Sequence, residues 1–121
     1  MNAPEFDELT DRIFSIDNKI RFVGIIDKNA KYYKMKQGAT SYLSKEETEE
    51  SMTDAMKRWE NRKKYATKLG NPFYAMAMYE KTKRFTIPIE DGLICISTEI
   101  DIDNDDMIYR ALNEIKKYFH N

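Results

Sequence analysis

Hydrophobic residues recur at helical spacing near both ends of the chain. Near the start, the apolar positions of one face are Phe6, Leu9, Ile13 and Ile16. With Pro4 as a helix-starting residue, they predict a helix over about Glu5–Ile16. Near the end, the apolar face is Met107, Ile108, Ala111, Leu112, Ile115 and Phe119. It predicts a last helix that Asp103 or Asn104 caps.

The longest predicted helix lies in the middle of the chain. Ser44 and Glu47 form a capping box, which marks its start. Gly70 and Pro72 forbid its continuation, so the helix is expected to end at about Leu69. Its first turns are rich in glutamate and its last turns in lysine and arginine, as the helix dipole favours. Its apolar stripe contains Met52, Ala55, Met56 and Trp59.

The remaining hydrophobic runs have the composition of β-strands. The apolar run Ile20–Ile26 and the more charged run Lys31–Lys36 are joined by a polar turn and predict a hairpin. Beyond Pro72, three further runs predict an antiparallel meander: Phe73–Tyr79, Arg84–Ile89 and Leu93–Ile100. The Asp-Gly pair inside Glu90–Gly92 is a hairpin signal. The predicted order is α-β-β-α-β-β-β-α, an α+β arrangement.

Size and charge narrow the class of protein further. The chain has 121 residues, a length that suits one domain over residues 1–121, and a net charge of −1. The first residues lack the basic start of a signal peptide, and no run approaches the roughly 20 apolar residues that cross a bilayer. We therefore expect a soluble, cytoplasmic protein.

The element order and two segments resemble known proteins. The chain resembles the Roadblock/LC7 family, within the profilin-like and longin-like group, through its order and its first hairpin, IRFVGIIDKNAK at Ile20–Lys31. The segments Arg21–Lys31 and Tyr74–Lys81 are also similar to those of small uncharacterised proteins of ammonia-oxidising archaea. The Roadblock resemblance implies a five-stranded antiparallel sheet in the order 2-1-5-4-3. It also implies that the first and last helices cover one face and the long helix covers the other.

In that sheet order, Phe73–Tyr79 is an edge strand of unusual composition. Edge strands normally carry Lys, Pro or a bulge that prevents pairing with other chains, but FYAMAMY holds no charge. We therefore expect a homodimer, or a dimer with a paralogue, in which this strand pairs with its copy while the middle helices pack together. The expected interface residues are Met52, Met56, Trp59, Phe73, Tyr74, Met76, Met78 and Tyr79.

Two charged clusters have competing interpretations. Glu99, Asp101, Asp103, Asp105 and Asp106 are spaced like cation ligands, but the glycine and glutamate of an EF-hand loop are missing, which favours helix-capping acids. The basic residues Lys57, Arg58, Arg62, Lys63, Lys64 and Lys68 could hold phosphates. The four glutamates earlier in the same helix and the net charge favour a solvated helix end instead.

The lone cysteine and histidine suggest no chemistry. Cys95 and His120 are too few for a conventional zinc site. Cys95 lies in a strand-like run and is expected to be buried, whereas His120, next to the chain end, is expected to lie in solvent. We therefore nominate no catalytic, cofactor-binding or metal-binding residue and expect no cofactor.

Three functions remain as hypotheses, in decreasing order of support. The first is a non-enzymatic, dimeric regulatory or scaffold domain that mediates protein–protein interaction. The second is a small-ligand sensory domain with a PAS-, GAF- or profilin-like cavity between the sheet and a helix layer. The third is a weak nucleic-acid binder that uses the basic half of the middle helix.

Overall fold

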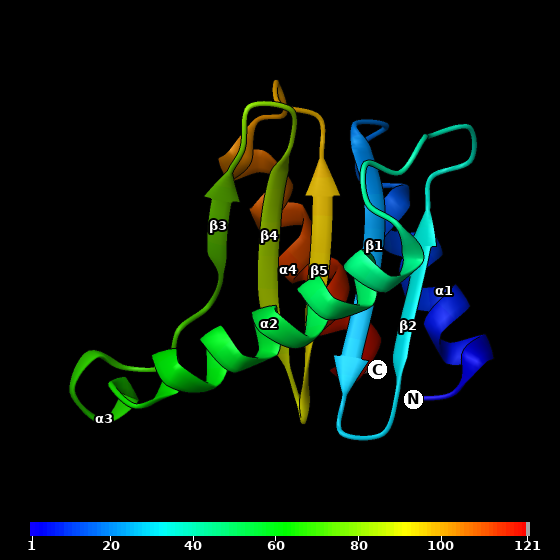
Figure 1. Ribbon diagram of the computed structural model, residues 1–121. Helices are drawn as coiled ribbons and strands as arrows, with labels where there is room; N and C mark the ends of the chain where they lie inside the picture. The colour runs from blue at the N-terminus through cyan, green and yellow to red at the C-terminus, as the bar shows by residue number, and fades with distance from the viewer. Residues whose placement is uncertain (121) are drawn as a thin grey trace.

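The computed structural model describes residues 1–120, with His120 described only as part of the last helix (Figure 1). The expectation that the His120 side chain lies in solvent therefore falls outside the described residues. The elements in chain order are α1 (Ala3–Phe14), β1 (Ile20–Asp27), β2 (Lys31–Met35), α2 (Lys45–Lys63), α3 (Ala66–Leu69), β3 (Ala75–Met78), β4 (Lys83–Ile89), β5 (Gly92–Thr98) and α4 (Asn104–His120).

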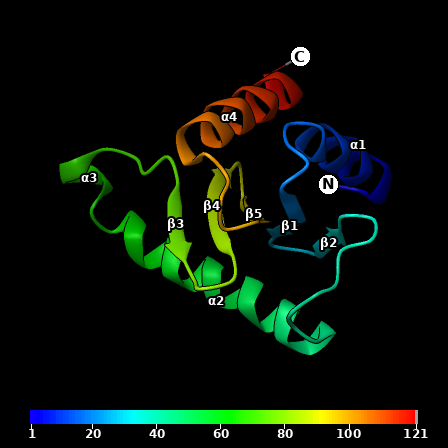
Figure 2. The ribbon, with the colours of Figure 1, turned by 90° about the horizontal axis from the view of Figure 1, so that it is seen from above.

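The strands form one antiparallel sheet between two helical layers. The sheet has five strands in the order β2-β1-β5-β4-β3. Figure 2 shows α1 and α4 on one face of the sheet and α2 on the other. The α+β fold, the sheet order and the placement of the helices predicted from the sequence are confirmed. None of the helices within the described residues is long and apolar enough to cross a membrane.

The larger core lies between the sheet and the pair α1 and α4. Leu9 and Ile13 of α1 are fully buried in it, as are Met107 and Ala111 of α4. The strands contribute alternate residues to this face, for example Phe85 and Ile87 of β4. The apolar stripes predicted for the two terminal helices are the faces that these helices bury, except at Phe119, which was expected in the buried face of the last helix but is 40% exposed near the end of α4, beyond the core.

The smaller core lies under α2. Met52, Ala55 and Trp59 are buried there against sheet residues such as Phe22 and Cys95. Gly24 of β1 allows this close approach, since a Cβ built on it would lie 2.9 Å from the Met52 Cε. The start of α2 follows the prediction, because the Ser44 side chain accepts a hydrogen bond from the Glu47 N–H while the Glu47 side chain accepts one from the Ser44 N–H.

The end of the middle helix differs from the prediction. One helix was expected to run to about Leu69, but α2 ends at Lys63 and the short helix α3 follows after a break at Lys64 and Tyr65. After Trp59 no side chain of α2 is buried, so tertiary packing no longer supports the helix. The break carries α3 away from the sheet (Figure 1).

The turn between β4 and β5 also differs in detail from the prediction. Ile89 pairs with Gly92, so Glu90 and Asp91 form the turn, and Asp91 adopts the positive φ of 61°. Gly92 is the first residue of β5, where a Cβ would lie 2.4 Å from the Ile26 carbonyl oxygen. The glycine is therefore needed for the close contact between β5 and β1, not for the turn itself.

Candidate functional site

The first candidate site is the free edge of β3. β3 pairs only with β4 among the described strands, and it spans Ala75–Met78 rather than the whole expected run. The Tyr79 N–H donates to the Thr82 carbonyl oxygen of the β3–β4 turn at 2.8 Å. Because backbone groups alternate in direction along an antiparallel strand, the N–H and C=O groups of Met78 and Met76 point away from β4. These groups are available to another strand.

Exposed apolar side chains lie on or next to this strand and in the segment of chain that leads into it. We call them the β3 surface: Tyr65, Leu69, Phe73, Tyr74, Met76, Met78 and Tyr79. Leu69 of α3 is 84% exposed and Met78 is 64% exposed, high values for large apolar side chains. Exposed large apolar side chains concentrated in one part of a chain are typical of an interaction site. The sequence prediction included the strand part of this set but missed Tyr65 and Leu69, because it assigned both to the long helix.

The structure places three of the expected interface residues elsewhere. Met52 and Trp59 of α2 are buried against the sheet, and Trp59 is only 1% exposed. Both side chains belong to the core of this chain, so the prediction that they lie in the interface is wrong. Met56 is half-buried and packs against the same core. The physical reason is that α2 has a single apolar stripe, and the sheet takes it. The helix therefore has no second apolar face to offer a partner.

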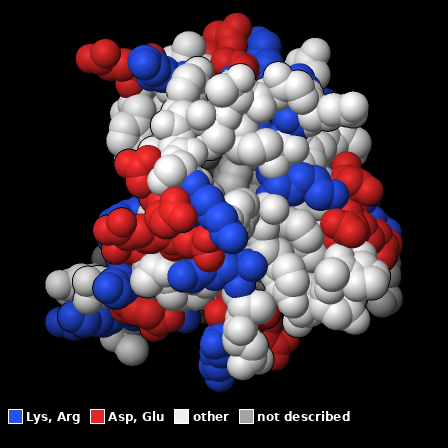
Figure 3. All heavy atoms as spheres, turned by 45° about the vertical axis from the view of Figure 1, so that its right-hand side comes forward, with Lys and Arg blue, Asp and Glu red and all other residues white. Residues whose placement is uncertain are grey.

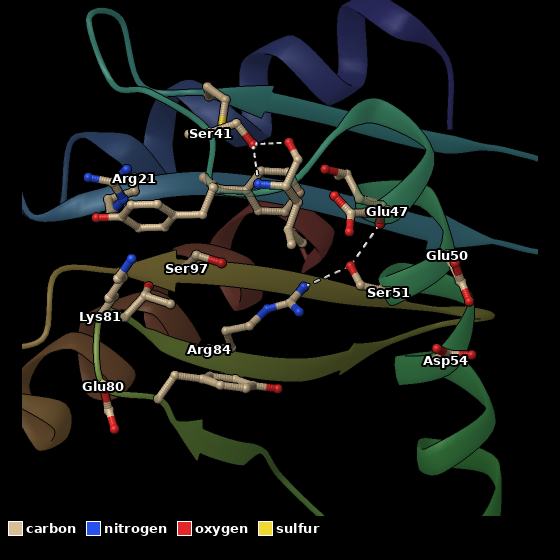
Figure 4. Close-up of a pocket in the computed structure, with 17 residues that line it drawn as sticks. Arg21, Ser41, Glu47, Glu50, Ser51, Asp54, Glu80, Lys81, Arg84 and Ser97 are labelled. Carbon is tan, nitrogen blue, oxygen red and sulfur yellow. Dashed lines mark hydrogen bonds between the residues drawn. The ribbon is translucent and has the colours of Figure 1, made fainter.

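The second candidate site is a cavity of about 550 Å³ beside the first half of α2, which we call the α2 cavity. The sheet contributes its floor, including Phe22, Arg84 and Ser97, and α2 forms one wall. The loop before α2 and the β3–β4 turn complete the rim (Figure 4). Residues from five separate segments of the sequence therefore meet in this cavity. For this reason no local sequence pattern predicted which residues line it.

Arg21 fixes the loop that borders the α2 cavity. Its guanidinium forms an ion pair with Glu99 at 2.8 Å, and the Arg21 side chain is only 12% exposed. It also donates to the Thr40 carbonyl oxygen at 2.6 Å and lies 4.6 Å from the centre of the Tyr42 ring. One hydrogen bond and one cation–π contact from Arg21 therefore attach the loop to the sheet.

Arg84 points from β4 toward α2 inside the cavity. Its guanidinium donates a hydrogen bond to the Ser51 hydroxyl at 3.0 Å, the contact drawn in Figure 4. Lys81 lies nearby on the β3–β4 turn, with its Nζ 5.7 Å from the centre of the Tyr42 ring. Neither side chain belongs to an ion pair among the described residues. The cavity therefore contains two positively charged side chains, Arg84 and Lys81, that form no ion pair with a carboxylate of the described residues.

The basic residues expected as a phosphate patch are exposed along the end of α2 and in α3. Lys63 forms an ion pair with Glu60 at 3.4 Å, and the Arg62 guanidinium lies 5.3 Å from the centre of the Trp59 ring. On the face shown in Figure 3, basic and acidic side chains interleave and do not form one large area of either sign. Lys57, Arg58, Lys64 and Lys68 are exposed as well, and the phosphate patch stays a prediction.

The acidic cluster after β5 has local partners. Glu99 pairs with Arg21 and Asp101 with Lys19, the latter at 3.2 Å. Asp103 caps α4, because its side chain accepts from the Asp106 N–H at 3.0 Å. Over the part of the chain that the structure describes, no group of three or more His, Cys, Asp or Glu is placed to hold a metal ion. The capping interpretation of Asp103 is confirmed.

Cys95 is buried in the core under α2. Burial raises the pKa of its thiol to about 11, although the positive charges of Arg84 and Arg58 act in the opposite direction. A thiol with so high a pKa is protonated at neutral pH and is a poor nucleophile. The expected structural role of Cys95 agrees with this environment.

The fold places this chain among small α+β domains of Roadblock/LC7-like architecture. A Roadblock/LC7 domain from Streptomyces avermitilis matches with a TM-score of 0.71 over 92% of each chain, at 8% identity. The gliding protein MglB from Thermus thermophilus matches with a TM-score of 0.74 at 10% identity, over 98% of this chain and 90% of MglB. MglC from Myxococcus xanthus matches with a TM-score of 0.56 at 9% identity, over 91% of this chain and 95% of MglC.

Comparisons at the level of sequence add nothing to this likeness. No protein-family model matches the chain, and neither does any curated protein. The resemblance to solved structures therefore shows the fold, as the sequence predicted, and the function rests on the chain's own surfaces.

Proposed function

We propose that this chain is a non-enzymatic regulatory or scaffold domain that forms a homodimer through the free edge of β3. The observation that carries the proposal is the pair of outward-facing backbone groups at Met76 and Met78 within an uncharged, exposed strand. Two copies related by a two-fold axis would pair these groups and extend the sheet from one chain into the next. A paralogue with a similar edge could take the place of the second copy.

The side chains of the β3 surface add hydrophobic area to this contact. Phe73, Met78 and Leu69 are among the most exposed apolar residues of the chain, and all lie on β3 or just before it in the sequence. Aromatic residues and methionines are enriched in protein interfaces, and charged residues are depleted from their centres. One of the solved structures with this fold is a tetrameric arrangement of MglB, which supports self-association as a use of the architecture.

Light scattering coupled to size exclusion tests the dimer. At tens of micromolar, the wild type should have twice the 14.4 kDa mass of one chain. Met78→Lys places a charge on the β3 surface, and Met76→Pro removes an outward-facing donor without breaking a bond to β4. Both variants should be folded monomers.

Tyr109→Lys is the matched control, because Tyr109 is a similarly exposed apolar residue on α4, away from the sheet edge. It should remain a dimer. A monomeric wild type would contradict self-association, and a dimeric Met76→Pro variant would show that β3 pairing does not form the contact. Circular dichroism checks that each variant keeps its secondary structure.

A further inference from the structure

The α2 cavity has the size and composition of a small-molecule site. Its volume of about 550 Å³ lies inside the range of roughly 300–1,000 Å³ that such sites occupy. Phe22, Met35 and Leu43 give it an apolar part, and several charged side chains converge on the rest. Of the residues that line the cavity, Tyr79 alone also belongs to the β3 surface, so a ligand here would be a function beyond dimer formation.

Most of the charges in the cavity lie on two opposite sides, with Glu80 beside Lys81 as the exception. Figure 4 shows Lys81 and Arg84 on the side of the β3–β4 turn and β4, and the carboxylates of Glu47, Glu50 and Asp54 on α2. The two groups do not neutralise each other, because none of these five side chains forms an ion pair within the described residues. Both groups are therefore available to one bound molecule.

Arg84 is the best-placed anion-binding group. It is half-buried, its hydrogen bond to Ser51 uses one donor, and a guanidinium carries five N–H donors. Its planar geometry suits a carboxylate, which accepts two parallel hydrogen bonds. Lys81 adds a second positive charge from the turn. Arg21 is not available in the same way, because Glu99 already neutralises it.

Glu47 is the best-placed group for a positive charge. One carboxylate oxygen, Oε1, accepts from the Ser44 N–H at 2.9 Å, which orients the side chain at the first turn of α2. The second oxygen is left to interact with a ligand. Glu50 and Asp54 follow along the same wall and add negative charge. A ligand with net negative charge would be repelled by this wall, and a simple cation would be repelled by Arg84.

We propose that the α2 cavity binds a small zwitterion with an apolar body, of the α-amino-acid class. Arg84 and Lys81 bind its carboxylate, Glu47 binds its ammonium group, and the apolar side chain lies against Phe22, Met35 and Leu43. This arrangement satisfies both sets of charges with one molecule.

An NMR titration of the ¹⁵N-labelled wild type with three related probes tests the proposal. L-phenylalanine carries both charges, 3-phenylpropionate only the carboxylate and 2-phenylethylamine only the ammonium group. L-phenylalanine should shift amide signals of cavity residues such as Ser51, Tyr42 and Arg84. Each truncated probe should bind at least about 10-fold more weakly, because one charged group of the site is then left without its partner. Equal binding of either truncated probe, or no binding of L-phenylalanine at millimolar concentration, overturns the proposal.

Two variants assign the charges to residues. Arg84→Met should weaken the binding of L-phenylalanine by about 10-fold or more, since it removes the carboxylate site. Glu47→Gln should do so too while leaving α2 intact, because glutamine also completes a capping box. Lys57→Met, on the exposed side of α2, is the control and should bind as the wild type does. Unchanged affinity in Glu47→Gln would contradict the ammonium site even if Arg84→Met does not fold.

Discussion

The Nζ of Lys83 lies 2.8 Å from the Asn104 Oδ1, and this contact joins the start of β4 to the start of α4. The same ammonium donates to the Ile102 carbonyl oxygen at 2.9 Å. Lys83 is only 7% exposed, which is unusual for a lysine. It satisfies backbone and side-chain acceptors in the loop between β5 and α4, so its role is to hold that loop against the sheet.

Removal of the Lys83 ammonium should therefore destabilise the fold. In Lys83→Met the side chain keeps much of its volume, but the Ile102 carbonyl and the Asn104 amide oxygen lose their donor. The expected loss is about 1–3 kcal/mol in the free energy of unfolding, measured by urea titration. Lys57→Met removes an exposed lysine and should change stability by less than about 0.5 kcal/mol. A Lys83→Met variant as stable as the wild type would show that the cost of burying the cation cancels its hydrogen bonds.

The turn after β1 should make stability depend on pH at acidic values. Burial tends to raise the pKa of Asp27, but hydrogen bonds from the Asn29 and Ala30 N–H groups and the charge of the N-terminal ammonium bring it below its ordinary value of 3.8. A carboxyl with a lower pKa in the folded state stabilises the fold above its unfolded-state pKa. This contribution is lost as the pH falls through the lower, folded-state value.

The measurement is the free energy of unfolding of the wild type and of Asp27→Asn as a function of pH. The variant should be less stable near pH 7, and the difference should shrink once the pH falls below about 4. Asp54→Asn, on the exposed face of α2, serves as the control. A difference between wild type and Asp27→Asn that stays constant with pH would contradict the role of the charge.

The native protein should protect its single thiol. With a pKa of about 11 instead of the ordinary value of 9.0, Cys95 has about 100-fold less thiolate at pH 8 than a free cysteine. Burial adds to this protection. Ellman's reagent should therefore label the native protein slowly and the urea-unfolded protein at once, while Cys95→Ala gives the background. Rapid labelling under native conditions would mean that α2 opens away from the sheet.

Gly92 should be the least replaceable glycine of the sheet. A Cβ at this position would lie 2.4 Å from the backbone oxygen of Ile26, and neither strand can move without disturbing their pairing. Gly92→Ala should cost about 3 kcal/mol of stability. In Gly38→Ala the added Cβ has no atom within 4 Å, and the backbone keeps a positive φ that alanine disfavours. This variant should lose only about 1 kcal/mol of stability. Thermal unfolding of the two variants measures which loses more stability. A larger loss in Gly38→Ala than in Gly92→Ala would contradict the predicted clash with the Ile26 carbonyl oxygen.

The sequence predicted the elements well because their signals are local. The capping box at Ser44 and the stripes of the terminal helices each lie within a few turns of chain, and all are found in the structure apart from the exposed Phe119. The early end of α2 was missed because helix propensity continues past Lys63, whereas the apolar contacts that stabilise the helix stop at Trp59. Packing against the sheet, which the sequence does not show directly, decides that boundary.

The sequence predicted the β3 edge but not the α2 cavity, because only local signals are visible in a sequence. The sheet order implied by the Roadblock resemblance placed Phe73–Tyr79 at an edge, and its uncharged composition predicted a pairing partner. Only the tertiary structure shows that Trp59 is needed for the core. Lys83 carried an overlooked signal, since it alternates in phase with the buried residues Phe85 and Ile87. The α2 cavity had no such signal, because Arg21, Ser51 and Arg84 meet only in the folded chain.

Tyr79 belongs to both the β3 surface and the rim of the α2 cavity. A second chain that fixes this ring would change the free energy of filling the cavity, and occupancy of the cavity would change the strength of chain association by the same factor. Through this one aromatic side chain, the fraction of the protein that is dimeric would then depend on the concentration of the ligand.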